Sequence, residues 1–278
     1  MKSIFSAAVL LLAVGTSTTV AGNPVYVGQR VRGTTAMSAV DHSTWNSLLQ
    51  KYVDNDGYVN YQSWHSSQSD RQALNQYLSR LSQGNPQLGD ENAKLAFWIN
   101  AYNAVTVQGI LREYPTTSIR NHTAKLVGYN IWKDLQLYVA GQPYSLEAIE
   151  HQILRKTGDG RIHFAIVCAS IGCPRLLNQA YTPQDVQQQL EVNAKDFFCR
   201  PQNFRFDART GNFQLSEIMN WYGSDFGNSQ SAQLQAIAKW LPDNASRAAA
   251  QQGRGRISFL KYDWNLNDQK VRGRVTRR

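Results

Sequence analysis

The pattern of apolar positions along this chain predicts a helix in three places. Between residues 45 and 53 they fall at i, i+3, i+4, i+7 and i+8, which predicts an amphipathic helix. A second helix is predicted over 74–81, where Leu74, Leu78 and Leu81 recur. The segment 94–114 is apolar on nearly every side and is followed by Pro115, so we expect a long, central, buried helix there.

Shorter apolar runs bounded by turn residues predict strands. We expect hairpins at 138–144 and 204–215, a strand at 58–61 and a last strand at 257–260. The continuous apolar run 162–167 fits a strand that is buried on both faces. Further helices are predicted after Ser145 and Thr182, and at 218–222 and 234–241. Because the two kinds of element do not alternate regularly, we expect a single α+β domain with several helices around a small, mostly antiparallel sheet.

The start of the chain resembles an export signal. Lys2 precedes an apolar run at 4–14, and small residues follow as far as Ala21. The run is shorter than the roughly 20 apolar residues that span a bilayer. We therefore expect residues 1–21 to be a cleaved signal peptide, although an uncleaved anchor remains an alternative. The mature protein would be exported, periplasmic or secreted, without a membrane span. Residues 22–38 are predicted to be a flexible segment and 39–269 the globular domain.

The positive charge of the chain is concentrated at its end. The net charge is +9, and the expected basic tail, 270–278, holds five of the cationic residues: Lys270, Arg272, Arg274, Arg277 and Arg278. No basic stripe interleaved with aromatic residues supports nucleic-acid binding. We expect no cofactor. We also expect no metal site, because His151, His163, Cys168 and Cys173 have no recognised metal-ligand spacing. The amino-acid sequence does not indicate an oligomeric state.

Candidate chemistry is concentrated in the segment 161–174, which reads RIHFAIVCASIGCP. The expected strand ends at Cys168, and a turn of small residues that includes Ser170 follows. Such a turn exposes a side chain and free backbone N–H groups, which suits a nucleophile beside an oxyanion hole. The chain has three cysteines, so at least one is unpaired within a monomer. From the residues alone, Cys168 is a nucleophile, an inert core residue or the partner of Cys173 in a disulfide.

A cysteine nucleophile needs a base, and histidine is the usual one. His163 precedes Cys168 by five residues, which in a regular strand puts the two side chains on opposite faces. His163 is equally consistent with a hydrogen-bonded core residue. His151, on the preceding helix, is free of that constraint. Glu147 lies four residues before His151 and Glu150 lies next to it, so either carboxylate is a candidate to orient the ring.

Two amides on the most apolar helix also need an explanation. Asn100 and Asn103 lie three residues apart, on one face of the helix predicted over 94–114. Buried amides must find hydrogen-bond partners. They either anchor neighbouring backbone or line a cleft and donate to an oxyanion, and we include both with Ser170 among the candidate substrate-binding residues.

Several longer segments resemble domain-of-unknown-function family 547, over about 53–267. These segments are AFWINAYNAVTVQGI, YSLEAIEHQILR, RIHFAIVCASIGCPRL, LSEIMNWYGSDFG and ISFLKYDWNL. The resemblance emphasises Trp98, Asn100, Asn103, Glu150, His151, His163, Cys168 and Pro174. Plant members with similar motifs can lack the second cysteine, which implies a free Cys168 and leaves Cys173 to pair with Cys199. A papain-like thiol-hydrolase architecture is a further hypothesis, for which no spacing argues.

Two functions follow as expectations. In the first, Cys168 attacks the carbonyl carbon of an amide or thioester, His151 is the base, and Glu150 or Glu147 orients it. The protein would then be a hydrolase or acyltransferase acting on a peptide or another small molecule of the cell envelope. In the second, the domain binds a ligand without catalysis and its polar residues are structural. A thioredoxin-like redox role is not favoured, because four residues rather than two separate Cys168 from Cys173.

Overall fold

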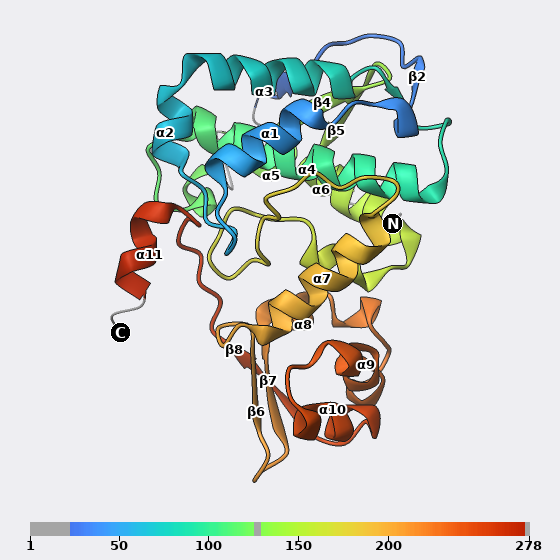
Figure 1. The fold of residues 1–278 in the computed structure, drawn as a ribbon, viewed down its shortest axis with the longest axis vertical. Coiled ribbons are helices and arrows are strands. Elements are labelled where there is room, and N and C mark those ends of the chain that lie inside the picture. Colours follow the sequence, from blue (N-terminus) through green and yellow to red (C-terminus); the bar gives the residue numbers. More distant parts are fainter. Residues whose placement is uncertain (1–22, 125–128, 276–278) are drawn as a thin grey trace, which may run out of the picture.

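The computed structural model describes residues 23–124 and 129–275 (Figure 1). The expected signal peptide, residues 1–21, lies outside them. The described residues form helices and three small sheets, with strand orders β1–β4–β5, β2–β3 and β6–β7–β8. The α+β class is therefore confirmed. The expected single, mostly antiparallel sheet is corrected to three small sheets, each of which contains a parallel pair of strands.

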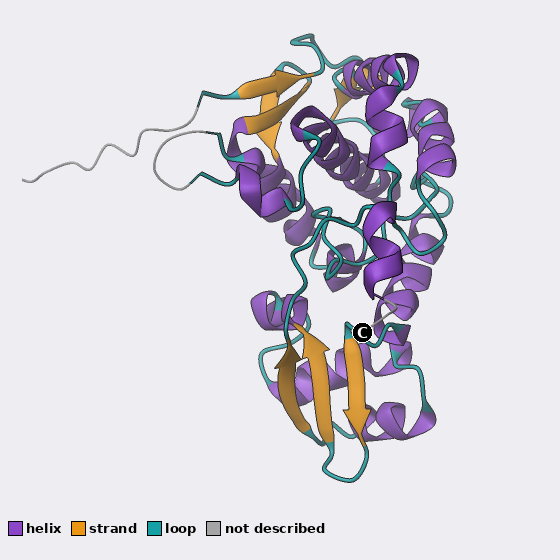
Figure 2. Ribbon diagram, turned by 90° about the vertical axis from the view of Figure 1, so that its left-hand side faces the viewer, coloured by secondary structure: helices purple, strands orange, loops and turns teal. Residues whose placement is uncertain are grey.

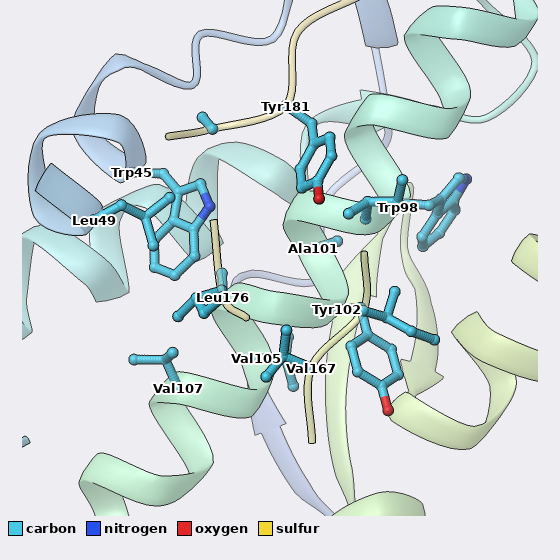
Figure 3. Close-up of a cluster of buried hydrophobic side chains, with 14 of the residues drawn as sticks. Trp45, Leu49, Trp98, Ala101, Tyr102, Val105, Val107, Val167, Leu176 and Tyr181 are labelled. Atoms are coloured by element: carbon cyan, nitrogen blue, oxygen red, sulfur yellow. The ribbon is translucent and has the colours of Figure 1, made fainter. Parts of the chain in front are cut away.

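Four helices build the first part of the molecule. They are α1 (Ser43–Tyr52), α2 (Tyr61–Ser66), α3 (Gln68–Leu81) and α4 (Glu91–Glu113). Helix α4 begins where the Asp90 carboxylate accepts a hydrogen bond from the Ala93 N–H at 2.8 Å, and it ends just before Pro115. Figure 3 shows its side chains within the main core, together with those of Trp45 and Leu49 from α1. The long central helix predicted over 94–114 is thus confirmed.

Residues 23–38, which belong to the segment expected to be flexible, contain two short strands and a 3-10 turn. Strand β1 (Val25–Val27) pairs in parallel with β4 (Leu135–Val139), which forms a hairpin with β5 (Gln142–Ser145). Strand β2 (Thr35–Ala36) pairs with β3 (Gly84–Asn85), and a 3-10 turn, η1 (Met37–Ala39), follows it. Met37 is fully buried. Backbone pairing and burial of this side chain explain why the segment is held in place.

Short helical turns lead from α4 to the centre of the molecule. They are η2 (Ile119–His122), α5 (Ile131–Asp134), α6 (Leu146–Ala148), η3 (Ile149–Leu154), η4 (Arg155–Thr157) and η5 (Gly160–Phe164). The strand expected at 162–167 is wrong: η5 covers its first residues, and an irregular segment follows. The strand expected at 58–61 is also wrong, because Val59 makes only isolated bridges and Tyr61 begins α2. A short buried apolar run does not by itself separate a strand from a helical turn.

The last part of the chain forms a second core around a three-stranded sheet. Its elements are α7 (Val186–Cys199), β6 (Phe204–Asp207), β7 (Asn212–Ser216), α8 (Glu217–Trp221), η6 (Gly223–Asp225), α9 (Gln230–Ile237), η7 (Ala238–Trp240), α10 (Asn244–Gln251) and β8 (Arg256–Leu260). The hairpin at 204–215 and the strand at 257–260 are confirmed. Figure 2 shows this sheet at the opposite end of the molecule from β1, β4 and β5. Phe164, Phe197, Phe213 and Trp240 belong to this second core.

The chain returns to the first core after β8. The Ile171 N–H donates to the Asn265 carbonyl at 2.9 Å, and the Leu266 N–H donates to the Thr117 carbonyl at 2.8 Å. Helix α11 (Gln269–Val275) then occupies most of the expected basic tail, and Arg272 pairs with Asp54 at 2.7 Å. The described part of that tail is therefore a docked helix. Among the described helices, none is long and apolar enough to cross a bilayer.

Candidate functional site

A cavity of about 260 Å³ lies where the two cores meet. Its walls come from α4, α5 and η3, from η5 and the segment after it, from α8 and the residue after it, and from the segment that follows β8. The residues that line it are Tyr102, Trp132, Glu150, His163, Ile166, Cys168, Cys173, Pro174, Ile218, Trp221, Tyr222, Tyr262 and Trp264. Three of the predicted catalytic residues, Glu150, His163 and Cys168, therefore line one cavity.

Cys168 and Cys173 form a disulfide in the wall of this cavity. Their Cα atoms are 6.4 Å apart, within the range that a disulfide spans. Between them Ala169 has a φ of 56°, in the left-handed region that non-glycine residues seldom adopt, and it turns the chain back on itself. The expectations of a free Cys168 and of a Cys173–Cys199 bridge are therefore wrong for this structure. Cys199 is a free, exposed thiol at the end of α7.

Hydroxyl groups surround the two sulfur atoms. The Cys168 Sγ lies 3.2 Å from the Ser170 Oγ and 3.3 Å from the Tyr262 hydroxyl oxygen. The Tyr262 hydroxyl also donates to the Cys173 Sγ at 3.1 Å, and the Cys168 N–H donates to the same atom at 3.0 Å. Burial raises the pKa of Tyr262 well above its usual value, so its hydroxyl stays protonated and able to donate. Cys168 itself is only partly buried, whereas Cys173 is buried.

His163 is buried and held by a carboxylate. Its Nε2 lies 2.8 Å from the Asp225 Oδ2, and its ring stacks on that of Tyr222 with centroids 4.0 Å apart. Arg155 donates to both oxygens of Asp225, each at 2.7 Å. These hydrogen bonds, Arg155 first, lower the pKa of Asp225 to about 2. Burial lowers the pKa of His163 even though the hydrogen bond with Asp225 raises it, so the ring is neutral at pH 7.

Glu150 faces the cavity from a stretch of π-helix, η3, a wider turn that is frequent at functional sites. It is 8% exposed, and one of its oxygens accepts a hydrogen bond from the Tyr102 hydroxyl at 3.2 Å. Burial, followed by the charge of Glu150, raises the pKa of Tyr102 and of Tyr222. Both hydroxyls therefore stay protonated beside the carboxylate.

The predicted base and its other partner lie elsewhere. His151 is exposed, does not line the cavity, and has its Nδ1 3.2 Å from the Arg155 Nη1. Glu147 is half-exposed, with its Oε1 3.6 Å from the Lys133 Nζ. Neighbouring residues of a helix point in different directions, so the inward orientation of Glu150 turns His151 outward. The structure therefore does not bring His151 or Glu147 to Cys168, and Glu150 does not orient His151.

The two amides of α4 anchor backbone. The Asn103 side chain donates to the Ala165 carbonyl at 3.0 Å and accepts from the Val167 N–H at 2.9 Å. Asn100 makes the same pair of hydrogen bonds with Tyr181, at 2.8 and 2.9 Å. Both amides are buried and neither lines the cavity, so the predicted substrate contact is replaced by a structural role. Ser170 is also buried, and it reaches the site only through the sulfur atoms and Tyr262.

Sequence reasoning missed Asp225, Tyr222 and Tyr262. All three lie in segments that carried the family resemblance, WYGSDFG and KYDW, but nothing local assigns them a role. Asp225 is 62 residues from His163, and Tyr262 is 94 residues from Cys168. Within residues 23–124 and 129–275, no group of three or more His, Cys, Asp or Glu side chains is placed to hold a metal ion.

Comparison with known families supports part of the resemblance. Residues 86–198 match the family described as "Protein of unknown function, DUF547". This segment of the chain is therefore similar to that family. No curated protein and no solved structure matches the chain. The DUF547 match includes Glu150, His163 and the disulfide, whereas Tyr222, Asp225 and Tyr262 lie beyond it. The cavity is thus completed by residues outside the matched segment, which is shorter than the stretch that the motifs resemble.

Proposed function

We propose that the cavity is the active site of a cysteine-dependent acyl-transfer enzyme, a hydrolase or an acyltransferase, that is activated by reduction. The observation that carries the proposal is that Cys168 and a histidine held by a carboxylate, His163 with Asp225, line the same cavity. A nucleophile, a base and a group that orients the base are the parts that such catalysis needs. In this proposal His163, and not His151, is the base.

Reduction comes first, and it requires an external dithiol. One thiolate of the dithiol attacks the disulfide, its second thiolate resolves the mixed disulfide, and the dithiol is itself oxidised to a disulfide. Cys168 and Cys173 each end with a thiol. The Cys168 N–H then loses the sulfur acceptor that it has in the disulfide form and becomes available to another acceptor. The partial exposure of Cys168 gives the dithiol its point of entry.

Acyl transfer then follows in two steps. His163, which is neutral, accepts the thiol proton while the Cys168 sulfur attacks the carbonyl carbon. The Tyr262 hydroxyl and the Cys168 N–H donate to the oxygen that becomes negative. His163 returns the proton to the departing amine or thiolate, which leaves an acyl group on Cys168. Water or a second nucleophile removes that group. The substrate class is a peptide or another amide or thioester, which the proposed export would place in the cell envelope.

The test measures acylation of the reduced protein by an activated ester such as p-nitrophenyl acetate. We expect the acyl group on Cys168, and we expect His163→Gln to lower the rate by roughly 10²-fold or more, as for loss of a general base. Asp225→Asn provides a second variant, which leaves the imidazole in place. His151→Gln is the matched control and should keep the wild-type rate. If folded His163→Gln and Asp225→Asn proteins are both acylated at the wild-type rate, His163 is not the base.

A second candidate follows from the disulfide as it stands. In that case the bond between Cys168 and Cys173 closes the loop permanently, and the cavity binds a ligand without catalysis. A disulfide in an exported domain commonly has this structural role. This candidate predicts that reduction lowers the stability of the protein and that no acyl group accumulates on Cys168.

A further inference from the structure

The Glu150 carboxylate is buried and forms no ion pair with any of the described residues. It is 8% exposed, and its hydrogen-bond partner is the neutral hydroxyl of Tyr102. Arg155, five residues further along the chain, forms its ion pair with Asp225 instead. Hydroxyl donors stabilise a carboxylate but do not neutralise it. Because a buried charge is costly without an opposite charge, the surroundings of Glu150 suit a cationic ligand.

Asp225 and Arg155, which lie beside the cavity, compensate each other's charge. The Arg155 guanidinium donates a hydrogen bond to each oxygen of Asp225 at 2.7 Å, so these two charges cancel. Burial lowers the pKa of His163, and its ring adds no positive charge at pH 7. Among the titratable side chains that line the cavity, Glu150 therefore supplies the uncompensated charge.

Four aromatic rings form a continuous wall in the same cavity. The ring centroids of Trp221 and Tyr262 are 4.9 Å apart, those of Tyr262 and Trp264 are 4.5 Å apart, and those of Trp132 and Trp264 are 6.5 Å apart. Trp221 is 44% exposed, an unusual position for so large an apolar ring. Aromatic faces attract cations, and the guanidinium of Arg120 already lies 5.1 Å from the Trp264 centroid.

We propose that this cavity binds the ammonium group of an alkylamine, such as a lysine side chain, between the Glu150 carboxylate and the aromatic wall. An ammonium group fits both surfaces, because its N–H groups donate to the carboxylate while its charge meets the ring faces. A volume of about 260 Å³ admits the end of a side chain rather than a folded partner. The inference rests on the proposed function, which makes the cavity a substrate site. It adds that the substrate of that site carries an amine.

The experiment measures binding, so it is independent of catalysis. N-acetyl-lysine methylamide and its uncharged analogue N-acetyl-norleucine methylamide are titrated against the oxidised, full-length protein and followed by calorimetry and tryptophan fluorescence. We expect the lysine compound to bind at least about tenfold more tightly, because it alone makes the cation–π contact and the ion pair. Glu150→Gln, which retains an acceptor for Tyr102, should remove that preference. Glu147→Gln, on the adjacent helical turn but half-exposed, should keep it.

Two outcomes would overturn the inference. The first is equal affinity for the two compounds in the wild-type protein, a result that does not depend on how any variant folds. The second is binding of N-acetylglucosamine without binding of the amine, which would make the aromatic wall a sugar platform. If the reduced wild-type protein acquires no acyl group on Cys168 but still prefers the amine, the catalytic proposal is rejected and the cation site stands.

Discussion

The pKa shifts of individual side chains at the cavity come mainly from burial and not from residues that are close in sequence. Burial is the first cause of the raised pKa of Tyr262 and of the lowered pKa of His163. The motif around Cys168 directed attention to His163 and Glu150, and all three residues line the same cavity. Asp225 could not be found in that way, because its role depends on a contact across 62 residues that only the fold creates.

Burial of histidine side chains should also make the folded protein less stable in mild acid. Burial lowers the pKa of His42 to about 4, and its Nδ1 lies 2.7 Å from the Tyr77 hydroxyl oxygen. A folded-state pKa below the unfolded value of about 6.5 gives stability that is present above that value and is lost as the pH falls towards 4. We expect the free energy of unfolding to decline over this interval by up to about 3 kcal/mol from His42 alone, with His163 adding in the same direction.

Urea unfolding at several pH values between 7 and 4 measures this effect. His42→Gln should flatten the decline, whereas His65→Gln, at a partly exposed position, should leave it as in the wild type. The account of His42 fails if the two variants and the wild type show the same dependence on pH.

Among the elements, those defined by local pattern were predictable and those defined by distant contacts were not. The hairpins at 138–144 and 204–215 and the central helix α4 follow from alternation, turn residues and apolar content within a short window. The run 162–167 has the composition of a buried strand, but its backbone bonds to Asn103 instead of to a neighbouring strand. Strand pairing of β1 with β4 likewise joins segments more than 100 residues apart, which no local pattern contains.

Asn103 should therefore stabilise the cavity wall as well as α4. Asn103→Ala leaves the Ala165 carbonyl and the Val167 N–H without their partner, and each buried group costs about 1–3 kcal/mol. We expect a loss of roughly 2–5 kcal/mol in the free energy of unfolding, measured with denaturant. Asn100→Ala should cost a similar amount, while Asn220→Ala at an exposed position should change stability by less than about 0.5 kcal/mol. A change as small for Asn103→Ala as for Asn220→Ala would refute the anchoring role.

For the whole molecule, the position of the cavity between two cores explains why it mixes residues from distant segments. Helix α4, η3 and the disulfide loop belong to the DUF547 match, and α8 and the segment after β8 close the cavity from outside it. The α+β class could be predicted, because it depends only on which elements occur. The division into three sheets and two cores could not, because it depends on the pairing of distant segments.

Mass-spectrometric acylation with and without a dithiol tests the central claim most directly. The wild-type protein, isolated without reductant, should resist acylation by the activated ester at Cys168 and should acquire one acyl group there after reduction. Cys173→Ser leaves Cys168 without its disulfide partner, so this variant should be acylated without any reductant, and Cys199→Ser should behave as the wild type does. Equal acylation of the oxidised and reduced wild-type protein, or a folded Cys173→Ser variant that stays inert, would contradict the account.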